Sequence, residues 1–474
     1  MSLLLLQPLA RLFDNEGFTL YAVGGMVRNP MLGLPITDMD VCSAMTPDGV
    51  IALCEKHGLK HLELGAAFGM IAIQIDCGGE KRYVEHTTFR SDAYDGSGAH
   101  RPASVRFSNS IEADAFRRDF TVNAMYRDIL TGELIDPTGG GEDLKWRVLR
   151  ATSKDPAIIL RDDGLRIMRL ARFAAELNFT PEPATFEAAK AYAYLLKDIS
   201  GERIQAELNK ILLSDVKYPS IKRIKTAPWD NAPFLGLSIL SGLLAYKYFL
   251  PELERCRGVE QKAQYHAFDV LGHSLRVAAC MPPALHMRLA GLLHDIGKPV
   301  ALEQSGRMYD HDKLGVGISR EILYKLRYSN EIRDKVLPLI GIHMFDLDNR
   351  AKDSTLRKRF AQWGERLALE LADIREADVT GSGVRRSPVA ESERWRALVS
   401  AMKRESAPFS EKELKCTGAD IMRWLNIGPS GRVGEIKRAL LRHCAVKPSD
   451  NTPERLERMA REIMEAERVQ TVRR

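Results

Sequence analysis

The pattern of hydrophobic and polar positions changes about a third of the way along the chain. Before that point, apolar runs and two-residue alternation predict three β-strands. These are "FTLYAVG" (18–24), "MIAIQIDC" (70–77) and "YVEHTTF" (83–89). "TPDGVIALCEKHG" (46–58) has the capping threonine and closing glycine typical of a helix. From about residue 145 onward, apolar positions recur with helical spacing. The sequence therefore predicts an α+β amino-terminal part and an almost entirely helical remainder.

Composition adds bounds to this picture. The chain has 474 residues and a formal net charge of +6, so we expect about two to four domains, and an anionic partner is permitted but not required. Seven cysteines are scattered singly, which argues against a disulfide framework and favours a reducing compartment. "MSLLLLQPLARLF" (1–13) fits a short amphipathic helix better than a signal peptide, and no apolar stretch is long enough to span a bilayer. We expect a cytoplasmic protein.

The stretch "VGGMVRNPMLGLPITDMDV" (23–41) is the first candidate for chemistry. Asp38 and Asp40 are two residues apart, so on a strand they project from one face. Two carboxylates that close repel unless a cation neutralises them, and Mg²⁺ prefers such oxygen ligands. The glycines end a strand, and "MVRNPML" (26–32) predicts a helix whose first amides, with Arg28, face phosphates. The alternative is a solvated turn, the usual meaning of an isolated Asp-x-Asp.

Arginines gather in two later segments. "RRDFTVNAMYRD" (117–128) places arginines, an aspartate and an asparagine on one predicted helical turn and its neighbour. The helix predicted within "GLRIMRLARFAAEL" (164–177) carries Arg166, Arg169 and Arg172 at intervals of three residues. Buried or cleft-lining arginines need anions, and phosphate is the obvious candidate. The alternative is that their stems cover a core while their charged heads remain in water.

Five motifs, in this order, resemble those of the class II tRNA nucleotidyltransferases, the group of CCA-adding enzymes and bacterial poly(A) polymerases. They are the metal motif "VGGMVRN…DMD", the ribose and triphosphate motif "RRDFTVNA", the hinge "IDPTGGGEDL" (135–144), the base-selecting "RDDGLRIMRLARFA" and the neck "ISGERIQAELNKIL" (199–212). The resemblance covers roughly 200 residues. It implies a nucleotidyltransferase head with a small mixed β-sheet and helices, followed by an all-α neck.

The resemblance also implies individual roles. Asp38 and Asp40 would hold Mg²⁺, with Glu85 as the third catalytic carboxylate. Together with the arginine stripe, the candidate nucleotide-binding residues are Gly24, Gly25, Arg28, Arg117, Arg118, Asp119, Asn123, Asp163, Arg166, Arg169 and Arg172.

Within this set, Asp163 and Arg166 would select the base by hydrogen bonding. A carboxylate only accepts and a guanidinium only donates. Cytosine and adenine both offer an exocyclic amine beside an acceptor ring nitrogen, whereas uracil and guanine present a carbonyl and a ring N–H instead. An Asp-Arg edge therefore accepts C and A and rejects the other two, because both contacts fail together.

Two positions depart from the pattern of the family. Asn29 stands where aspartate is usual, and Asp162 stands where glutamate is usual, although no predicted metal ligand is lost. "TTFRSDAYDGSGAHRPASVRF" (87–107) resembles the flexible loop with which such enzymes change from C to A addition. That loop favours full CCA addition over CC-adding, A-adding or poly(A) variants, although the sequence separates these relatives poorly.

A second constellation lies downstream. It comprises His273 in "HAFDVLGHSLRV", His294 and Asp295 in "RLAGLLHDIGKP", His311 in "YDHDKLG", His343 in "LIGIHMF" and Asp378 in "DIREADVTG". An apolar helix that ends in adjacent His and Asp must satisfy both groups, and a divalent metal held by two histidines and two aspartates does so. The alternative is a set of satisfied core histidines in a scaffold.

The set His273, His294, Asp295 and Asp378 resembles that of the HD phosphohydrolases, and His311 and His343 would extend it toward a second ion. The resemblance implies hydrolysis of phosphomonoesters or 2′,3′-cyclic phosphates with a transition-metal ion such as Ni, Mn, Fe or Co.

We therefore predict five regions and a principal activity. The regions are a head (1–145), a helical neck (146–215), a helical connector (216–255), an HD-type domain (256–385) and a carboxy-terminal helical region that contacts tRNA (386–474). The predicted activity is CCA addition to tRNA with CTP and ATP and release of pyrophosphate. The alternatives are a poly(A) polymerase or partial enzyme, a tRNA-binding scaffold with an inactive transferase, and an HD phosphohydrolase whose amino-terminal half only binds RNA. The sequence leaves the oligomeric state open.

Overall fold

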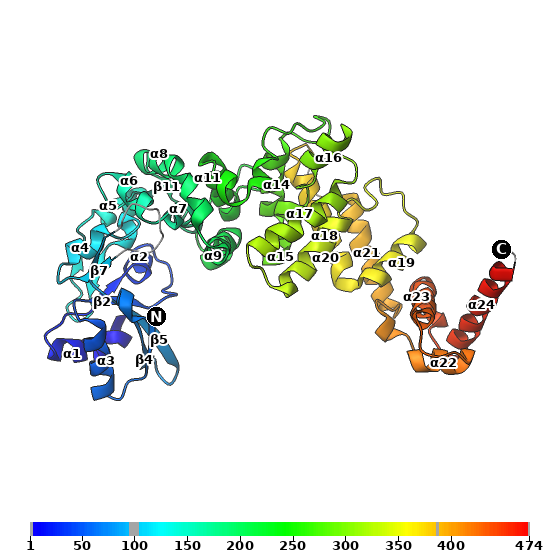
Figure 1. Cartoon of the computed structure of the whole chain (residues 1–474), viewed down its shortest axis with the longest axis horizontal. Helices are drawn as coiled ribbons and strands as arrows, with labels where there is room; N and C mark the ends of the chain where they lie inside the picture. Colours follow the sequence, from blue (N-terminus) through cyan, green and yellow to red (C-terminus); the bar gives the residue numbers. More distant parts are fainter. Residues whose placement is uncertain (1–2, 94–103, 385–387, 473–474) are drawn as a thin grey trace. The chain divides into compact units, whose positions relative to one another are not determined.

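The computed structural model describes residues 3–93, 104–384 and 388–472. The chain divides into two compact units (Figure 1). Unit 1 comprises Met1–Glu254 with Tyr324–Tyr328, and unit 2 comprises Arg255–Leu323 with Ser329–Arg474. The finer division into five regions remains a prediction.

Unit 1 begins with the predicted mixed sheet. Its seven strands lie in the order β3 (His61–Gly65), β4 (Met70–Asp76), β5 (Lys81–Thr88), β2 (Asp40–Ser43), β1 (Tyr21–Val23), β8 (Tyr126–Asp128) and β9 (Leu134–Ile135). The β2–β5 pair is parallel and the other neighbours are antiparallel. The three strands predicted from the sequence correspond to β1, β4 and β5, and the fold class is confirmed.

Helices of unit 1 begin where the sequence provides a cap. In α3 (Pro47–Lys56) the Thr46 side chain accepts a hydrogen bond from the Gly49 amide, and Gly58 follows the helix with φ +65°. The amino-terminal segment forms η1 (Leu3–Leu6) and α1 (Gln7–Asn15), as predicted for an amphipathic helix. Val23, Cys42, Phe89, Ala115, Ala124 and Tyr126 form a buried core beside the sheet.

The arginine-rich segment 117–128 differs from its prediction. It is not one helical turn and its neighbour, because Arg117 and Arg118 follow the end of α4 (Ile111–Phe116). The segment then makes a short 3-10 turn, η3 (Thr121–Asn123), and enters the sheet as β8. Phe120, Tyr126 and the residues between them are buried, so sheet pairing and packing override a helical pattern here.

The other strands of unit 1 form two small sheets, β6 (Arg90–Ala93) with β7 (Ser104–Phe107), and the two-residue strands β10 (Val148–Leu149) with β11 (Thr180–Pro181); the remaining described elements are helices. The helices of unit 1 after α4 are α5 (Gly140–Trp146), α6 (Pro156–Asp162), α7 (Leu165–Leu177), α8 (Pro183–Ala191), α9 (Gly201–Leu212), α10 (Ser214–Lys217), α11 (Ala232–Gly242), α12 (Tyr246–Phe249) and α13 (Pro251–Glu254). Gly236 lets α11 approach closely, since a Cβ there would lie 2.7 Å from Ile211 and 3.0 Å from Ala175. α7 is thereby buried on almost every side.

All the secondary-structure elements among the described residues of unit 2 are helices. Its helices are α14 (Val270–Cys280), α15 (Leu285–Leu293), α16 (Lys298–Ser305), α17 (His311–Lys325), α18 (Asn330–Ile342), α19 (Asp353–Trp363), α20 (Glu365–Gly381), α21 (Ala390–Arg404), α22 (Gly418–Leu425), α23 (Gly431–Val446) and α24 (Pro453–Val472). Glycines set the closest contacts: a Cβ at Gly381 would lie 2.8 Å from Val277, and one at Gly291 would lie 3.1 Å from Ala278. α14, α15 and α20 therefore pack tightly and bring their polar side chains together.

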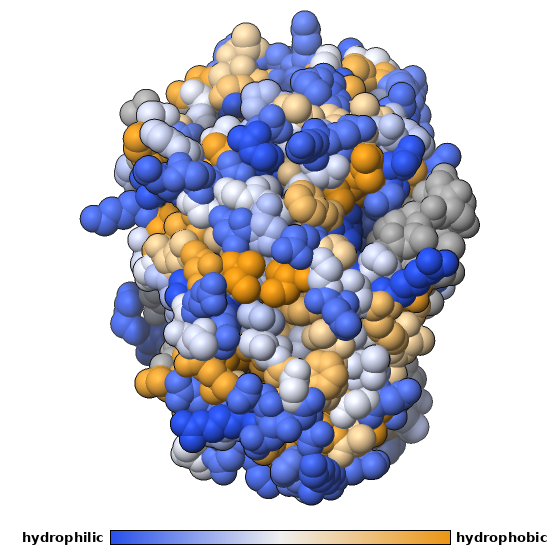
Figure 2. Space-filling model, turned by 90° about the vertical axis from the view of Figure 1, so that its left-hand side faces the viewer, coloured by the Kyte–Doolittle hydropathy of each residue, from blue (hydrophilic) through white to orange (hydrophobic). Residues whose placement is uncertain are grey.

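The surface mixes polar and apolar side chains. On the face drawn in Figure 2, hydrophilic residues surround small groups of hydrophobic ones. Exposed apolar side chains such as Leu62 and Leu64 on β3 are scattered, as is normal for a protein surface. None of the helices, as far as residues 3–93, 104–384 and 388–472 go, has the length and apolar character needed to cross a membrane.

Candidate active site and candidate metal centre

Three predicted carboxylates meet at the edge where β2 and β5 run parallel. Asp40 opens β2, and its Cα partner in β5 is Glu85. Asp38 is not on the strand as predicted, because it lies in a bend before β2, with its side chain 66% exposed. The two aspartates therefore do not share a strand face. The structure nevertheless places Asp38, Asp40 and Glu85 close enough for each neighbour to perturb the Asp40 carboxyl.

The electrostatics at Asp40 favour a cation. Burial, with the negative charges of Glu85 and Asp38, raises the pKa of Asp40 to about 6. Arg118 and Arg169 oppose this rise without cancelling it. A carboxylate whose neighbours disfavour its ionisation gains most from a divalent cation. These three side chains thus fit the oxygen-rich donor set of such an ion.

Gly24 adapts the backbone to this edge. It has φ +63°, a conformation that side-chain-bearing residues rarely adopt, and a Cβ there would lie 3.8 Å from Asp40 Oδ2. α2 (Gly25–Met31) then begins at Gly25, as the sequence predicted, and carries Arg28. The glycine pair therefore places the start of α2, the helix that carries Arg28, beside Asp40.

Arg28 is buried, with 3% of its surface exposed, and the side chains to which it donates hydrogen bonds are neutral. Its Nε and Nη2 donate to Asn29 Oδ1 at 3.1 and 2.8 Å, and its Nη1 donates to Asn123 Oδ1. Among the residues that the structure describes, no carboxylate forms an ion pair with Arg28. Burial lowers the pKa of this guanidinium, which shows how costly its uncompensated charge is. An anion beside Arg28 would relieve that cost.

The other arginines of the head differ, because a buried carboxylate pairs with them. Asp114 Oδ1 lies 2.6 Å from Arg117 Nη2, and Asp114 Oδ2 lies 2.9 Å from Arg118 Nη2. Tyr126 also donates its hydroxyl to Asp114, at 2.7 Å. Although burial opposes ionisation, Arg118 and Arg117 hold the pKa of Asp114 at about 2. Asp114 was not predicted, yet its position three and four residues before the two arginines is the spacing of helical ion pairs.

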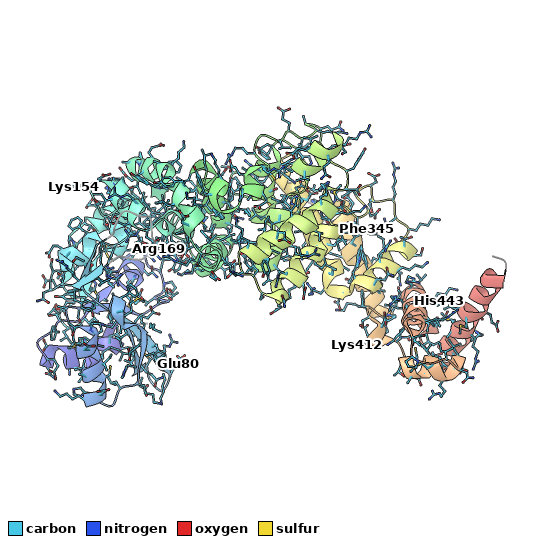
Figure 3. The ribbon with its side chains drawn as sticks, in the orientation of Figure 1. Glu80, Lys154, Arg169, Phe345, Lys412 and His443 are labelled. Carbon is cyan, nitrogen blue, oxygen red and sulfur yellow. The ribbon has the colours of Figure 1, made fainter. Side chains whose placement is uncertain are left out.

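Asp119 and Asn123 join the head to α7. Asp119 Oδ1 accepts from the Asn123 amide at 3.1 Å, and Asp119 Oδ2 accepts from Arg169 Nε at 2.7 Å. Burial raises the pKa of Asp119, but Arg169 outweighs it and the pKa falls to about 2. Arg28, Asn123, Asp119 and Arg169 thus form one continuous network, of which Figure 3 labels Arg169.

The predicted base-reading pair lies at the start of α7. Asp163 Oδ2 accepts from Arg203 at 3.0 Å, and its Oδ1 accepts from the Leu165 amide at 3.0 Å. Arg166 donates to the carbonyl oxygens of Ile159 (2.9 Å) and Arg117 (2.7 Å). These contacts fix the orientation of both side chains. A carboxylate only accepts hydrogen bonds and a guanidinium only donates them, so the pair presents one group of each kind.

Arg172 does not fit the prediction that the stripe faces phosphate. Its Nε lies 3.2 Å from Glu207 Oε2 of α9 and 4.0 Å from Glu176. Arg172 is 5% exposed, so protein carboxylates already supply its anion. The sequence held a signal for Glu207, which is a single acid among the apolar positions Ile204, Leu208 and Ile211 of one helix face.

The six predicted residues of the second constellation converge in unit 2. Two groups of potential ligands form, His273 with His294 and Asp378, and Asp295 with His311 and His343. Asp295 lies between them, because its Oδ2 is 3.2 Å from His294 Nε2 and its Oδ1 is 3.1 Å from His311 Nε2. The structure therefore brings together all six candidates.

The histidine rings are oriented as metal ligands usually are. The Nδ1 atoms of His294, His311 and His343 lie 2.7–2.9 Å from the carbonyl oxygens of Gly291, Met308 and Ile340. In the neutral tautomer that donates from Nδ1, each Nε2 has its lone pair on the side of the cluster, and the Nε2 atoms of His273 and His294 are 3.2 Å apart. Burial opposes a charge on His294, but Asp295 and Asp378 outweigh it and raise its pKa to about 10. The pKa of His343, by contrast, is lowered, chiefly by burial. The two aspartates thus favour positive charge at His294 in particular.

A cavity of about 1000 Å³ in unit 2 opens onto this cluster. Its lining includes Asp295, His311, His343 and Asp378. Lys298, which was not predicted, lies 2.5 Å from Asp295 Oδ2 and also lines the cavity. A ligand of nucleotide size would fit such a volume.

A carboxylate-bearing mixed sheet with an arginine-rich neck, followed by a helical His-Asp cluster, defines a nucleotidyltransferase joined to an HD-type domain. Models of three families match in the same order. Residues 20–150 match the "Poly A polymerase head domain", residues 178–226 the "Probable RNA and SrmB- binding site of polymerase A", and residues 265–381 the "HD domain". Domains of the first and third kinds generally use divalent metal ions.

Relatives extend this match over most of the chain. It is 31% identical over 438 residues to the A-adding tRNA nucleotidyltransferase of Deinococcus radiodurans, covering 88% of this chain and 89% of that protein. It is 30% identical over 380 residues to a CCA-adding enzyme of Streptococcus pyogenes, covering 78% and 77%. The chain belongs to the tRNA nucleotidyltransferase and poly(A) polymerase family, and it is an enzyme of the nucleotidyltransferase class.

Solved structures agree on the fold. The Bacillus stearothermophilus CCA-adding enzyme in complex with CTP superimposes with a TM-score of 0.70 at 24% identity, over 100% of both chains. A Thermotoga maritima CCA-adding enzyme complexed with tRNA gives a TM-score of 0.57 at 17% identity, over 97% of this chain and 95% of that chain. Both confirm the predicted α+β head with a helical body.

Proposed function

We propose that this enzyme adds CCA to the 3′ end of tRNA in the cytoplasm, using CTP and ATP and releasing pyrophosphate. The observation that supports this most is the juxtaposition of three carboxylates, which repel one another, with Arg28, a buried arginine without a carboxylate partner. A nucleoside triphosphate with its divalent cation satisfies both at once.

In this proposal Asp38, Asp40 and Glu85 hold Mg²⁺, which when bound activates the RNA 3′-hydroxyl and stabilises the leaving pyrophosphate. Arg28 donates to the triphosphate from the start of α2, where Gly24 and Gly25 allow close approach. The hydroxyl oxygen attacks the α-phosphorus, and the bond to the β-phosphate oxygen breaks.

Asp119 and Asn123 hold the ribose, and the remaining arginines have less direct parts. Arg117 and Arg118 form ion pairs with Asp114 and would donate to the phosphates from the same guanidinium groups. Arg169 and Arg172 act by fixing Asp119 and α9, respectively. Asp163 as acceptor and Arg166 as donor, both held at the start of α7, would read the edge of cytosine or adenine.

The test supplies purified enzyme with tRNA that lacks its 3′ end, together with each nucleoside triphosphate in turn. Sequencing of the product termini should show CCA with CTP and ATP, and no addition of U or G. Repeated A would show a poly(A) polymerase. CC alone, or A only on a tRNA that already ends in CC, would show a partial enzyme.

A-adding activity is the principal rival, since the Deinococcus radiodurans relative that matches over 88% of this chain is an A-adding enzyme. The loop at 87–107, on which the sequence favoured CCA addition, lies partly outside the described residues, at 94–103. The strands at its two ends, β6 (Arg90–Ala93) and β7 (Ser104–Phe107), pair antiparallel. Replacing residues 94–103 by a short glycine linker should abolish A addition and leave C addition intact if the first proposal holds.

We also propose phosphohydrolase activity in unit 2, because six potential ligands converge beside a cavity. His273, His294 and Asp378 would hold one ion and Asp295, His311 and His343 a second. An ion such as Ni, Mn, Fe or Co, when bound, would activate water for attack on phosphorus at neutral pH. The substrates would be phosphomonoesters or 2′,3′-cyclic phosphates at RNA ends.

His294→Ala should lower the affinity of unit 2 for metal by at least about 100-fold, because loss of even an outer-sphere partner can cost that much. Metal analysis of the purified protein and hydrolysis of 2′,3′-cyclic AMP are the measurements. His286→Ala is the matched control, since His286 pairs with Glu370 in the same unit, outside the cluster. Equal metal content in both variants would contradict the proposal.

A further inference from the structure

Asn29, one of the two departures from the family pattern, has every hydrogen-bonding position of its side chain in use. Its Oδ1 accepts two bonds from Arg28. Its Nδ2 donates to the carbonyl oxygen of Pro35 at 2.9 Å and to the hydroxyl oxygen of Tyr218 at 3.0 Å. A primary amide has two donor hydrogens and one acceptor oxygen, so these four bonds define one orientation.

Tyr218 lies near the beginning of the predicted helical connector (216–255), a region for which the sequence predicted no chemical role. It follows directly after α10 and is 3% exposed. It reaches Asn29 across 189 positions of sequence. Its neighbour Lys217 lies 3.8 Å from Asp38 and 3.7 Å from the buried Glu176. The end of α10 is therefore part of the wall of the nucleotide site.

We propose that Tyr218 is a positioning residue for the incoming nucleotide. Its hydroxyl fixes the amide of Asn29, and the amide oxygen in turn fixes the Arg28 guanidinium that donates to the triphosphate. This inference rests on the proposed nucleotide site.

The physical reason is the asymmetry of the amide. Rotated by half a turn, Asn29 would present N–H groups to the N–H groups of Arg28, and donor would face donor. Two acceptors, Pro35 and Tyr218, hold the amide the other way round. Without the hydroxyl, one buried N–H is unsatisfied and the preference for the correct orientation weakens. Arg28 would then sample positions unsuited to the triphosphate.

The expected effect falls on substrate binding. Tyr218→Phe removes one hydroxyl and should raise the KM for ATP and CTP by about five- to twentyfold, the range expected when one buried partner is lost. The kcat should stay within about twofold, because no group at the reacting atoms changes.

Tyr246→Phe is the matched control. Tyr246 is fully buried in α12, and its hydroxyl donates to the carbonyl oxygen of Leu237 at 3.0 Å, within the same unit. Its loss should lower the melting temperature without changing KM. If Tyr218 had only a structural role, Tyr218→Phe would likewise lower the melting temperature without changing KM.

A double-mutant cycle tests the route through Arg28. In an Arg28→Ala background, Tyr218→Phe should leave KM unchanged, because the residue that it positions is absent. The inference is overturned if Tyr218→Phe alone leaves KM at the wild-type value, or if its effect persists in full in the Arg28→Ala background. A wild-type enzyme that incorporates no nucleotide would instead overturn the proposed function, and this inference with it.

Discussion

The two candidate sites solve opposite electrostatic problems. In unit 1, buried carboxylates such as Asp114, Asp119 and Glu207 neutralise most of the arginines from within the protein. In unit 2, histidine and aspartate donors converge on one small volume, and Lys298 and Arg375 lie beside them, paired with Asp295 and Asp378. The first site positions arginines that belong to the protein, whereas the second brings together ligands for a metal cation.

The difference shows which charges are available for chemistry. An arginine with a carboxylate partner has its charge compensated and serves to orient its neighbours. Arg28, held by neutral amides, keeps its charge for an external anion. Likewise, in the described part of the chain no basic side chain lies within hydrogen-bond distance of Asp38, Asp40 or Glu85. These carboxylates therefore remain available to bind a cation. Function is thus indicated by charges that the fold leaves uncompensated.

The largest expected effect separates the two sites completely. Asp40→Asn should reduce nucleotide addition by at least about a thousandfold, since it removes a ligand of the ion that stabilises the transition state. The metal content of unit 2 and its hydrolytic activity should not change. Incorporation of radiolabelled ATP and hydrolysis of 2′,3′-cyclic AMP measure the two reactions. Glu63→Gln on β3, an exposed carboxylate of the same sheet, is the control.

The next effect compares two buried arginines. Arg172→Met removes the buried guanidinium shared by Glu207 and Glu176, leaving only Lys210 and Lys217 at 3.7 Å among the described residues, and should lower the free energy of unfolding by about 3–5 kcal/mol. Arg28→Met should change it by no more than about 1 kcal/mol, because relief of an uncompensated charge offsets the lost hydrogen bonds. Yet Arg28→Met should raise the KM for ATP far more. Urea unfolding and nucleotide titration measure these quantities, and equal destabilisation would refute the distinction between the two arginines.

The smallest effect concerns pH. Because burial, Glu85 and Asp38 raise the pKa of Asp40 to about 6, protons should compete with the cation below that pH. The Mg²⁺ requirement of nucleotide addition should increase up to about tenfold per pH unit below 6. In the metal-free protein, the contribution of Asp40 to stability should be greatest below its ordinary pKa of 3.8 and be lost as the pH rises through about 6. Glu85→Gln should move both transitions to lower pH, and a pH-independent Mg²⁺ requirement would contradict this account.

The sequence predicted those features that depend on local pattern. Alternating residues identified β1, β4 and β5, and a capping threonine identified α3, because both signals act within a few residues. The segment 117–128 was misjudged as helical because its strand character arises from pairing between β8 and β1, about a hundred positions away in sequence. The bend at Asp38 is not marked by a local sequence pattern as strong as the strand alternation or the helix cap.

The sequence by itself determined which donors the protein has: the carboxylates at 38, 40 and 85, the arginine stripe and the six His-Asp ligands. Only the tertiary structure decided which of the charges are compensated. Arg169 meets Asp119 across 50 positions and Asn29 meets Tyr218 across 189. A helical pattern gives the face on which a side chain lies, but the partner on that face comes from another element, which the packing of the whole unit selects.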